Sequence, residues 1–278
     1  MSQSTAAGIA ASAFLVNELR ARKPELSLDR FAHLWVNAET LKISQNYDEE
    51  VYPDDAIALG IRNRFFLKRI ERFQQQHRDA TILNIGSGFT NYPFLVESPL
   101  NFIEVDFPHV VDFKARTVEE FVASGRLPPR EIQFLGCDLR EESERKQLEK
   151  NLASQLAGSP SLFVMEGVTY YLPSEALMEL FGIAERNQIS GSQLVFDYWP
   201  PELATQKTCT RFREYLSKRL GYTNRSYSYL TAEWISNRSG YRVDELTDVL
   251  RKQTEYELAP KLTAEYGVLD AYASLTRI

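Results

Sequence analysis

Two glycines, Gly86 and Gly88, stand on either side of Ser87, directly after a short apolar run at residues 81–85. Glycine has no Cβ and reaches backbone angles that other residues avoid, so the chain can turn tightly there and approach a ligand closely. A third glycine three residues later would complete a dinucleotide-binding loop, but Asn91 stands at that position. Taken alone, the loop fits a tight turn or a ligand site, and the missing glycine argues against a nicotinamide-dependent dehydrogenase.

Acidic residues follow the next apolar runs, where the carboxyl ends of parallel strands would form a binding edge. Asp106 comes about 20 residues after the glycine loop begins, a distance typical of a carboxylate that accepts hydrogen bonds from ribose hydroxyls. Asp138 would accept from the amino group of an adenine ring, and the apolar Leu139 would cover that ring. Glu166 would face the same cleft. With the glycine loop, this pattern favours a ligand that contains a nucleoside.

Only a parallel sheet would bring these residues together, and the chain from residue 81 onwards has the pattern of one. Near-continuous apolar runs separated by helical periodicity are typical of parallel strands that are buried on both faces. Helical periodicity is clear at Leu148, Leu152 and Leu156, which repeat every four residues. The predicted strands are residues 81–85, 101–105, 131–137, 161–165 and 192–198. We therefore predict a doubly wound α/β domain with helices on both faces of the sheet.

The segments before and after this sheet have different patterns. Before it we predict helices at residues 11–22, 28–41 and 61–77, which would form a helical cap. In the last of these helices, Phe66, Ile70 and Phe73 fall on one face. After it we predict strands at 241–246 and 267–275 around a helix at 244–253.

Four segments resemble, in sequence and in order, the motifs of the leucine carboxyl methyltransferase family. They are residues 84–88, 102–108, 137–140 and 166–172. The resemblance continues upstream at residues 61–65, at 27–32 and at Thr5-Ala6, and thus runs from the first residues to about Tyr198. Members of this family have the Rossmann-like class I methyltransferase fold and use S-adenosylmethionine, so the resemblance implies the same fold and cofactor for this chain.

The resemblance also implies roles for individual residues. Arg62 would pair with the carboxylate of the methionine moiety, Gly86 would lie under that moiety, and Asp106 would hold the ribose. A guanidinium suits a carboxylate because it donates two parallel hydrogen bonds, and acidic groups suit ribose hydroxyls and a sulfonium. The residues implied to bind the cofactor are Arg62, Gly86, Ser87, Gly88, Asp106, Asp138, Leu139 and Glu166.

Two features of the motifs qualify this interpretation. Many family members continue the glycine loop with Asp-Thr-Arg, where this chain has Thr90-Asn91-Tyr92. Arg62 is one of five cations in the same predicted helix. We expect most of these cations on a solvated helix face; the other four are Arg64, Lys68, Arg69 and Arg72.

Fewer residues indicate how a methyl acceptor would be held. Tyr170 and Tyr171 would help to position it, although a tyrosine of ordinary pKa is a poor base at neutral pH. We expect His109 at a helix start or in solvent. We also expect Asp197 in solvent, the alternative being a carboxylate that supports the site or lies on its acceptor side. An aromatic stretch is as consistent with packing as with a wall of the acceptor site; it comprises Tyr222, Tyr227, Tyr229 and Trp234, with Arg225.

The composition excludes several classes of protein. The chain has 278 residues with a formal net charge of −6, which makes a broad electrostatic grip on nucleic acid or anionic lipid a poor expectation. Two cysteines and three scattered histidines offer no metal-ligand spacing, so no metal is expected. No apolar run reaches the roughly 20 residues of a membrane helix. We expect a cytoplasmic protein, whose oligomeric state the residues do not indicate.

The functional hypothesis is an S-adenosylmethionine-dependent O-methyltransferase that acts on a small, natural-product-like acceptor of secondary metabolism by direct in-line transfer. Carboxyl methylation of a protein C-terminus or an acidic metabolite is the alternative, and a regulatory protein that binds the cofactor without catalysis is a third. We expect one domain, with the helical cap at residues 1–78, the cofactor-binding core at 79–200, and a part at 201–278 that completes the sheet and closes over the acceptor.

Overall fold

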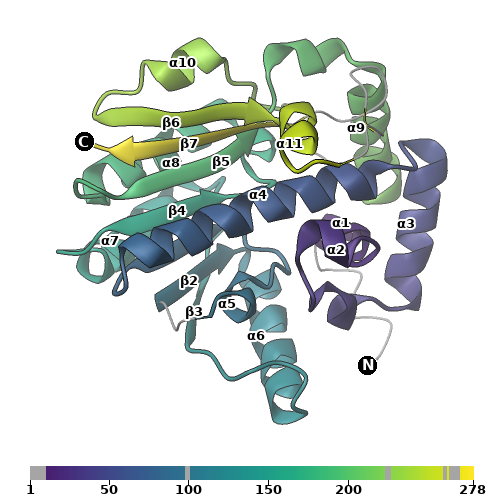
Figure 1. Ribbon diagram of the computed structural model, residues 1–278, viewed down its shortest axis with the longest axis horizontal. Helices are drawn as coiled ribbons and strands as arrows, with labels where there is room; N and C mark the ends of the chain where they lie inside the picture. The colour runs from purple at the N-terminus through teal and green to yellow at the C-terminus, as the bar shows by residue number, and fades with distance from the viewer. Residues whose placement is uncertain (1–10, 98–100, 223–226, 259–261, 263–269) are drawn as a thin grey trace.

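Seven strands form one sheet in the order β3-β2-β1-β4-β5-β7-β6 (Figure 1). The strands are β1 (Thr81–Ile85), β2 (Asn101–Asp106), β3 (Ile132–Gly136), β4 (Ser161–Met165), β5 (Gln193–Tyr198), β6 (Tyr241–Asp248) and β7 (Ala271–Arg277). Strands β1 to β5 are parallel, and β7 pairs antiparallel with both β5 and β6. The order reverses between β1 and β4, so the carboxyl ends of these strands diverge into a binding crevice. The computed structural model describes residues 11–97, 101–222, 227–258, 262 and 270–278.

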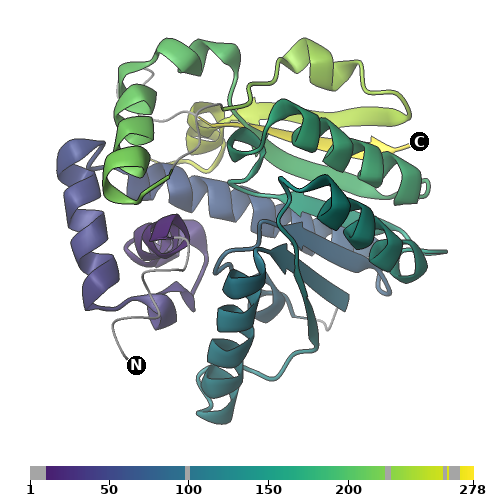
Figure 2. The same cartoon turned by 180° about the vertical axis from the view of Figure 1, so that it is seen from behind.

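Helices cover both faces of the sheet, as expected from the sequence. In Figure 1 the long helix α4 (Asp55–Gln76) crosses one face, and Figure 2 shows α7 (Glu142–Gln155) and α8 (Ser174–Asn187) on the other. The remaining helices of the core and C-terminal part are α5 (Tyr92–Leu95), α6 (Pro108–Ala123), η3 (Thr169–Tyr171), η4 (Pro201–Thr205), α9 (Lys207–Arg219), α10 (Ala232–Ser236) and α11 (Val249–Glu255).

Successive residues of the strands point to opposite faces and so supply two hydrophobic cores. On the α4 side, Phe66, Ile70 and Phe73 are fully buried together with residues such as Ile82, which confirms the predicted helix face. On the other side, Leu83 belongs to a separate core with the leucines of α7 and α8. The predicted doubly wound α/β class is confirmed, and the predicted strands of the parallel part are correct to within a residue or two.

The helical cap departs from the prediction between residues 28 and 41. Instead of one helix, the chain forms η2 (Ala32–Trp35) and the start of α3 (Ala38–Glu50) there. Helices α1 (Ala11–Ala21) and α2 (Pro24–Ser27) precede this segment. Leu28 ends α2 in the left-handed region at φ 58°, which no continuing helix allows. Asn37 then starts α3, because its side chain accepts from two backbone N–H groups and Thr40 completes a capping box.

Boundaries of other elements were also predicted wrongly. Helix α4 begins at Asp55 rather than at residue 61, and β6 continues to Asp248, so α11 begins only at Val249. Within the described residues the last strand begins at Ala271 and continues to Arg277 rather than ending at residue 275. Residues 267–269, Thr5, Ala6 and Arg225 lie outside the described residues.

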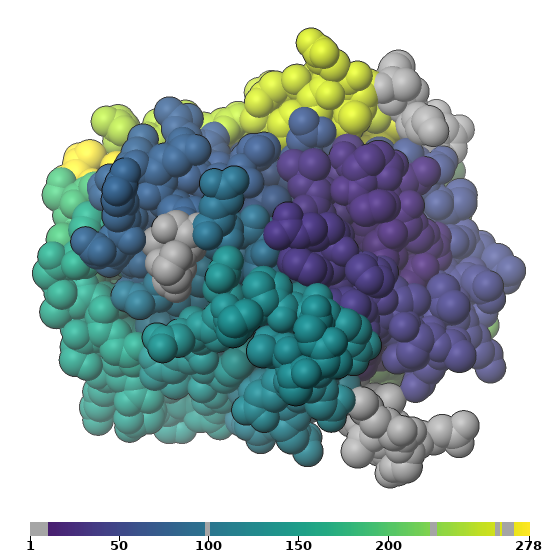
Figure 3. Space-filling model, turned by 60° about the horizontal axis from the view of Figure 1, so that its bottom comes forward, coloured from purple at the N-terminus to yellow at the C-terminus, as the bar shows by residue number. Residues whose placement is uncertain are grey.

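The cap packs against the sheet domain at the carboxyl ends of its strands. Figure 3 shows the N-terminal residues in purple beside the teal residues around α6, on one continuous face. No helix in the part of the chain that the structure describes has the length and apolarity needed to cross a bilayer.

Candidate active site

The glycine loop follows β1 and is fixed by the neighbouring strand β2. The N–H groups of Gly86 and Ser87 donate to the carbonyl of Val105 at 2.8 and 3.0 Å. Gly86 and Gly88 have φ values of 69° and 44°, in the left-handed region that favours glycine. A Cβ on Gly86 would lie 2.8 Å from Val168, so this position also lacks room for a side chain.

Asp106 stands at the end of β2 and faces this loop. Its carboxylate accepts from the N–H of Gly88 at 2.8 Å and from that of Phe107 at 2.7 Å. Burial raises the pKa of Asp106, and these two N–H groups oppose that rise. Glu104 of the same motif points elsewhere: it is fully buried and pairs with Lys114 at 2.6 Å. Of the two acids, only Asp106 lies at the binding edge.

Asn91, which replaces the third glycine, attaches the cap to the loop. Its amide group donates to the carboxylate of Asp29 at 2.9 Å, and its carbonyl oxygen accepts from the indole of Trp35 at 3.0 Å. The Trp35 ring stacks on Phe89 with ring centroids 4.7 Å apart. A glycine could make neither of the two side-chain hydrogen bonds of Asn91, so the departure from the dinucleotide pattern has a structural role here.

A cavity of about 1020 Å³ lies between the cap and the carboxyl ends of the strands. Pockets for small molecules are typically 300–1,000 Å³, so this cavity lies at the upper end of the range for a ligand site. Every residue predicted to bind the cofactor lines it, as do Tyr170 and Tyr171. Ser87 is among them, and its hydroxyl is buried with no hydrogen-bond partner among the described residues.

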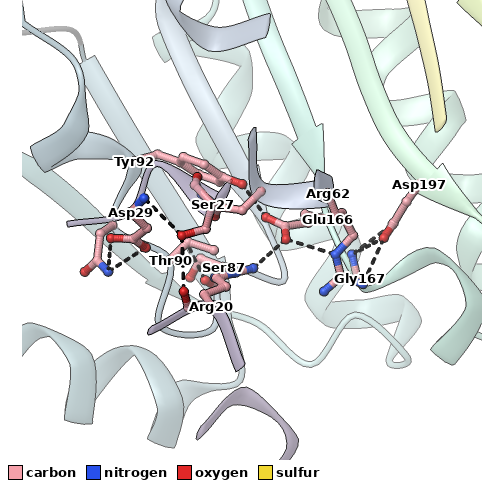
Figure 4. A network of polar contacts seen from close by, with 12 residues as sticks. Arg20, Ser27, Asp29, Arg62, Ser87, Thr90, Tyr92, Glu166, Gly167 and Asp197 are labelled. Atoms are coloured by element: carbon pink, nitrogen blue, oxygen red, sulfur yellow. Dashed lines mark hydrogen bonds and ion pairs between the residues drawn. The ribbon is translucent and has the colours of Figure 1, made fainter. Parts of the chain in front are cut away.

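Glu166 is the centre of a buried polar network (Figure 4). One of its carboxylate oxygens accepts from Arg20 and, at 3.1 Å, from Nε of Arg62; the other accepts from the hydroxyl of Tyr92. Burial alone would raise the pKa of Glu166, but the two arginines hold it below its usual value. The three donors come from α1, α4 and α5, so this carboxylate ties the cap to the sheet domain.

Two more carboxylates surround Arg62, which is 3% exposed. Its Nη1 donates to Asp270 at 3.1 Å and to the Tyr170 hydroxyl at 3.2 Å, and it lies 3.4 Å from Asp197. Asp197, predicted to be solvated, is fully buried and accepts from the N–H of Gly167 at 2.8 Å. That prediction was wrong because β5 ends beneath Arg62 rather than in solvent.

Burial changes how these carboxylates hold protons. It raises the pKa of Asp197 well above its usual value, with Arg62 opposing the rise and Asp270 adding to it. The pKa of Asp270 is also raised by burial, against the pull of Arg62 and of the Trp199 indole, which donates to it at 2.9 Å. The cluster therefore combines two arginines with Glu166, whose pKa is lowered, and with Asp197 and Asp270, which hold their protons to a higher pH than usual.

Asp138 and Leu139 line the cavity beyond β3. The Asp138 carboxylate pairs with Arg140 at 2.6 Å, and hydrogen bonds from this arginine lower its pKa. The Asp138 N–H donates to Glu144 at 2.6 Å. Leu139 is 6% exposed and gives this end of the cavity an apolar wall.

The aromatic residues divide between the cavity and the core. The Tyr170 ring stacks on Trp199 with centroids 4.3 Å apart, and burial raises its pKa well above the usual value, as it does for Tyr171. Of the later aromatic stretch, Tyr222 lines the cavity, where its hydroxyl lies 2.6 Å from that of Ser12.

The rest of that stretch packs outside the cavity lining. Tyr227 and Tyr229 pack around Trp199, whereas Trp234 packs on Phe181 in the core beneath α8. His109 is exposed at the start of α6 and stacks on Phe107, as predicted for a helix start, and it also lines the cavity.

Two buried acidic groups of the cavity were not predicted at all. Asp270 precedes β7, far from every motif, and no local sequence signal marks it. Asp55 lies in the first turn of α4, where the Tyr47 hydroxyl donates to it at 2.5 Å. Asp55, Leu59 and Arg62 have the spacing of one helix face, a signal that was lost when the helix was predicted to begin at residue 61.

Comparisons with known proteins identify the relatives of this chain. The sequence pattern of the family described as leucine carboxyl methyltransferase matches residues 7–184. A protein of Mycobacterium marinum named "Putative S-adenosyl-L-methionine-dependent methyltransferase" is 33% identical over 123 residues, 44% of this chain and 39% of that protein. A relative of the same name from Mycolicibacterium paratuberculosis is 27% identical over 165 residues, 58% of this chain and 51% of the relative. These matches span about two fifths to one half of the curated relatives' length.

The fold is shared with a solved structure. A DUF574 family protein from Streptomyces avermitilis superposes with a TM-score of 0.66 at 16% sequence identity, covering 99% of this chain and all of the other. At this identity the likeness concerns the fold alone.

Proposed function

The chain belongs to the leucine carboxyl methyltransferase family, and from this premise we propose that it is an S-adenosylmethionine-dependent O-methyltransferase acting on a small molecule. One observation carries the proposal: the glycine loop, Asp106 and the Arg20–Arg62–Glu166 cluster all line one cavity at the carboxyl ends of the strands. S-adenosylmethionine supplies an activated methyl group, so the protein has to bind, orient and shield the reactants rather than form a covalent intermediate.

The charges of the buried cluster suit the methionine end of the cofactor. Arg62 and Arg20 supply donors for the methionine carboxylate, and Glu166, Asp197 and Asp270 supply acceptors for the ammonium group and a favourable field for the sulfonium. Because the cluster holds both signs of charge, it fits a group that is itself zwitterionic.

The other end of the cavity suits a nucleoside. Asp106 takes the ribose hydroxyls, since each carboxylate oxygen can accept more than the one N–H it already has. Asp138 and Leu139 frame the adenine. The glycine loop lets the backbone approach the ligand closely, and the Ser87 hydroxyl, which has no hydrogen-bond partner among the described residues, lies at the same wall of the cavity.

We assign the parts of the single domain accordingly: residues 79–200 form the main part of the cofactor site, and the cap (1–78) and the C-terminal part (201–278) enclose the acceptor. Arg20 and Arg62 of the cap and Asp270 of the C-terminal part also reach the methionine end of the cofactor site. Support comes from the cavity lining, to which α1, α3, α4 and the region around Gly221 and Tyr222 all contribute. Tyr170 and Tyr171 act by position and not as bases, in keeping with their raised pKa values.

A second candidate is carboxyl methylation, which the description of the family favours. Calorimetric titration with S-adenosylmethionine, with NAD as the control, tests the cofactor, and transfer of a labelled methyl group to hydroxyl and carboxyl acceptors tests the reaction. Micromolar binding of S-adenosylmethionine without NAD binding supports the proposal, and binding of NAD alone contradicts it. Because a ligand of the folded state raises its stability, a shift in melting temperature gives an independent reading.

A further inference from the structure

One face of helix α4 lines the cavity from the Arg20–Arg62–Glu166 cluster to the far end. Asp55, Ala58, Leu59 and Arg62 follow the i, i+3, i+4, i+7 spacing, and all four line the cavity. An α-helix rises 1.5 Å per residue, so Asp55 stands roughly 10 Å further along the axis than Arg62. The cavity therefore continues about two helical turns beyond the place of the methionine carboxylate.

The walls of this far part, which we call the α4 chamber, are mainly apolar and aromatic. Its lining residues include Ile43, Tyr47, Leu59, Tyr171 and Phe212, with Asp55 as the buried acid among them. The other acid that lines the cavity from α3 is Glu39, whose side chain is exposed. Tyr47 is 1% exposed, and its ring is held edge-on by Phe212 and Tyr215 at centroid distances of 6.1 and 5.3 Å. The Tyr47 hydroxyl donates to the carboxylate of Asp55 at 2.5 Å. Because the Tyr47 ring is held in place, this hydrogen bond also holds the Asp55 carboxylate in place.

The charges around the chamber disfavour an anionic guest. Within the described residues Asp55 has no salt bridge, whereas each arginine that lines the cavity already has one. Those pairs are Arg20 with Glu166, Arg62 with Glu166, Asp197 and Asp270, Arg140 with Asp138, and Arg219 with Glu50. In the proposed function the methionine carboxylate takes the remaining donors of Arg20 and Arg62, while Arg140 and Arg219 are paired with Asp138 and Glu50. A second carboxylate entering the chamber would thus meet Asp55 without a free arginine of its own among the lining residues that the structure describes.

Resting on the proposed methyl transfer, we propose that Asp55, held by Tyr47, is the catalytic base that takes the proton from an acceptor hydroxyl. The acceptor is then an alcohol or phenol on an apolar or aromatic frame and not a carboxylate. In this step the acceptor oxygen bonds to the methyl carbon, and the electrons of the broken carbon–sulfur bond stay on sulfur. The hydroxyl proton moves to the Asp55 carboxylate, so the sulfonium and the carboxylate both lose their charge.

The proton affinity of Asp55 suits this role. Burial raises its pKa to about 6, so the group is ionised at neutral pH yet more basic than an exposed aspartate. The groups that act on it are Tyr47 and Asp48 from α3, Arg62 from its own helix, and Asp270 before β7. The Tyr47 hydrogen bond and Arg62 lower the pKa, and the two aspartates raise it.

The first arm of the test measures binding with two probes that share one ring system, 2-naphthol and 2-naphthoate. Wild type and Asp55→Asn are first titrated with S-adenosylmethionine, and the probes are then titrated into the complex with S-adenosylhomocysteine at neutral pH. We expect both proteins to bind S-adenosylmethionine equally. In wild type 2-naphthol should bind at least about tenfold tighter than 2-naphthoate, and Asp55→Asn should remove that preference because the repelling charge is gone.

The second arm measures single-turnover methylation of 2-naphthol against pH. We expect Asp55→Asn to lower the rate by about 10²-fold, the size typical of a general base, and to abolish the acid limb of the profile. Tyr47→Phe should move that limb to higher pH, because the hydrogen bond that lowers the Asp55 pKa is lost. Asp54→Asn, at an exposed acid next in the chain, is the control and should behave like wild type.

The outcomes separate this inference from the function on which it rests. Failure of wild type to bind S-adenosylmethionine overturns the proposed function and the inference together. Normal S-adenosylmethionine binding with a preference for 2-naphthoate, or with no binding of 2-naphthol, overturns the inference alone. So does bound 2-naphthol that is not methylated, or an Asp55→Asn rate within about threefold of wild type.

Discussion

Replacing Arg62 by methionine tests how far the buried cluster depends on a single cation. Arg62 is 3% exposed and contacts Glu166, Asp197 and Asp270 within 3.4 Å, and Arg20 is the only other cation with a salt bridge to these three acids in the described structure. Methionine fills a similar volume but leaves these carboxylates without their main counter-charge. Removing one partner of a buried ion pair typically costs about 3–5 kcal/mol, so we expect Arg62→Met to lose stability in that range at neutral pH.

The loss should depend on pH in a defined direction. Burial already raises the pKa values of Asp197 and Asp270 in the folded protein, and removing Arg62 takes away a group that lowers them. A carboxylate whose folded-state pKa lies above its unfolded value stabilises the fold at low pH and loses that contribution as the pH rises through the folded pKa. The cost of Arg62→Met should therefore shrink as the pH falls from neutral towards about 5.

Urea unfolding of wild type and variant at both pH values measures this cost. The matched control is Lys68→Met on the same helix, whose side chain is 53% exposed and pairs with Glu71 at 2.7 Å. An exposed pair contributes less than about 1 kcal/mol, so the control should change little at either pH. A loss below about 1 kcal/mol in Arg62→Met, or a loss that grows in acid, would refute the dependence of the cluster on this arginine.

Three further predictions concern the cofactor and the reaction. Asp106→Ala should weaken S-adenosylmethionine binding by roughly 1.5–3 kcal/mol, the value of charge-assisted hydrogen bonds; unchanged affinity in calorimetry would remove the ribose assignment. Arg62→Lys should weaken cofactor binding almost as much as Arg62→Ala, since a point charge cannot replace the guanidinium fork, and wild-type affinity would show that the fork is not used. His109→Ala should keep most activity, because His109 is exposed and stacks on Phe107; a drop of about 10²-fold in the single-turnover rate would make it a base instead.

The sequence was sufficient for the parallel sheet because each strand has a local signal. The apolar runs at β1 and β4 were predicted to the residue, and the strand ends then placed Asp106, Asp138 and Glu166 on one edge. The carboxyl ends of parallel strands share an edge whatever their order in the sheet. A prediction of site residues from strand ends therefore does not need the full topology.

Long-range partners could not be predicted in this way. Asp197 was expected in solvent because nothing near it in sequence shows that Arg62 lies above it. Asp270 is a lone acid until β7 inserts beside β5. Asp55 was missed because helix starts are set by capping and tertiary packing more than by propensity, and α4 begins without a side-chain cap. The role of a residue that depends on a partner distant in sequence can be identified only from the structure.

The position of Asp270, directly before β7, couples the cofactor site to the pairing of the antiparallel strands. Strand β7 lies between β5 and β6, with Ala271 opposite Tyr198 in one pairing and Asp248 in the other. A slip of one residue would turn the side chains of β7 to the opposite face and carry the Asp270 carboxylate away from Arg62 and Trp199. A ligand that binds the intact cluster therefore favours the native register, and by thermodynamic linkage it should slow amide hydrogen exchange in β6 and β7, away from the cavity itself.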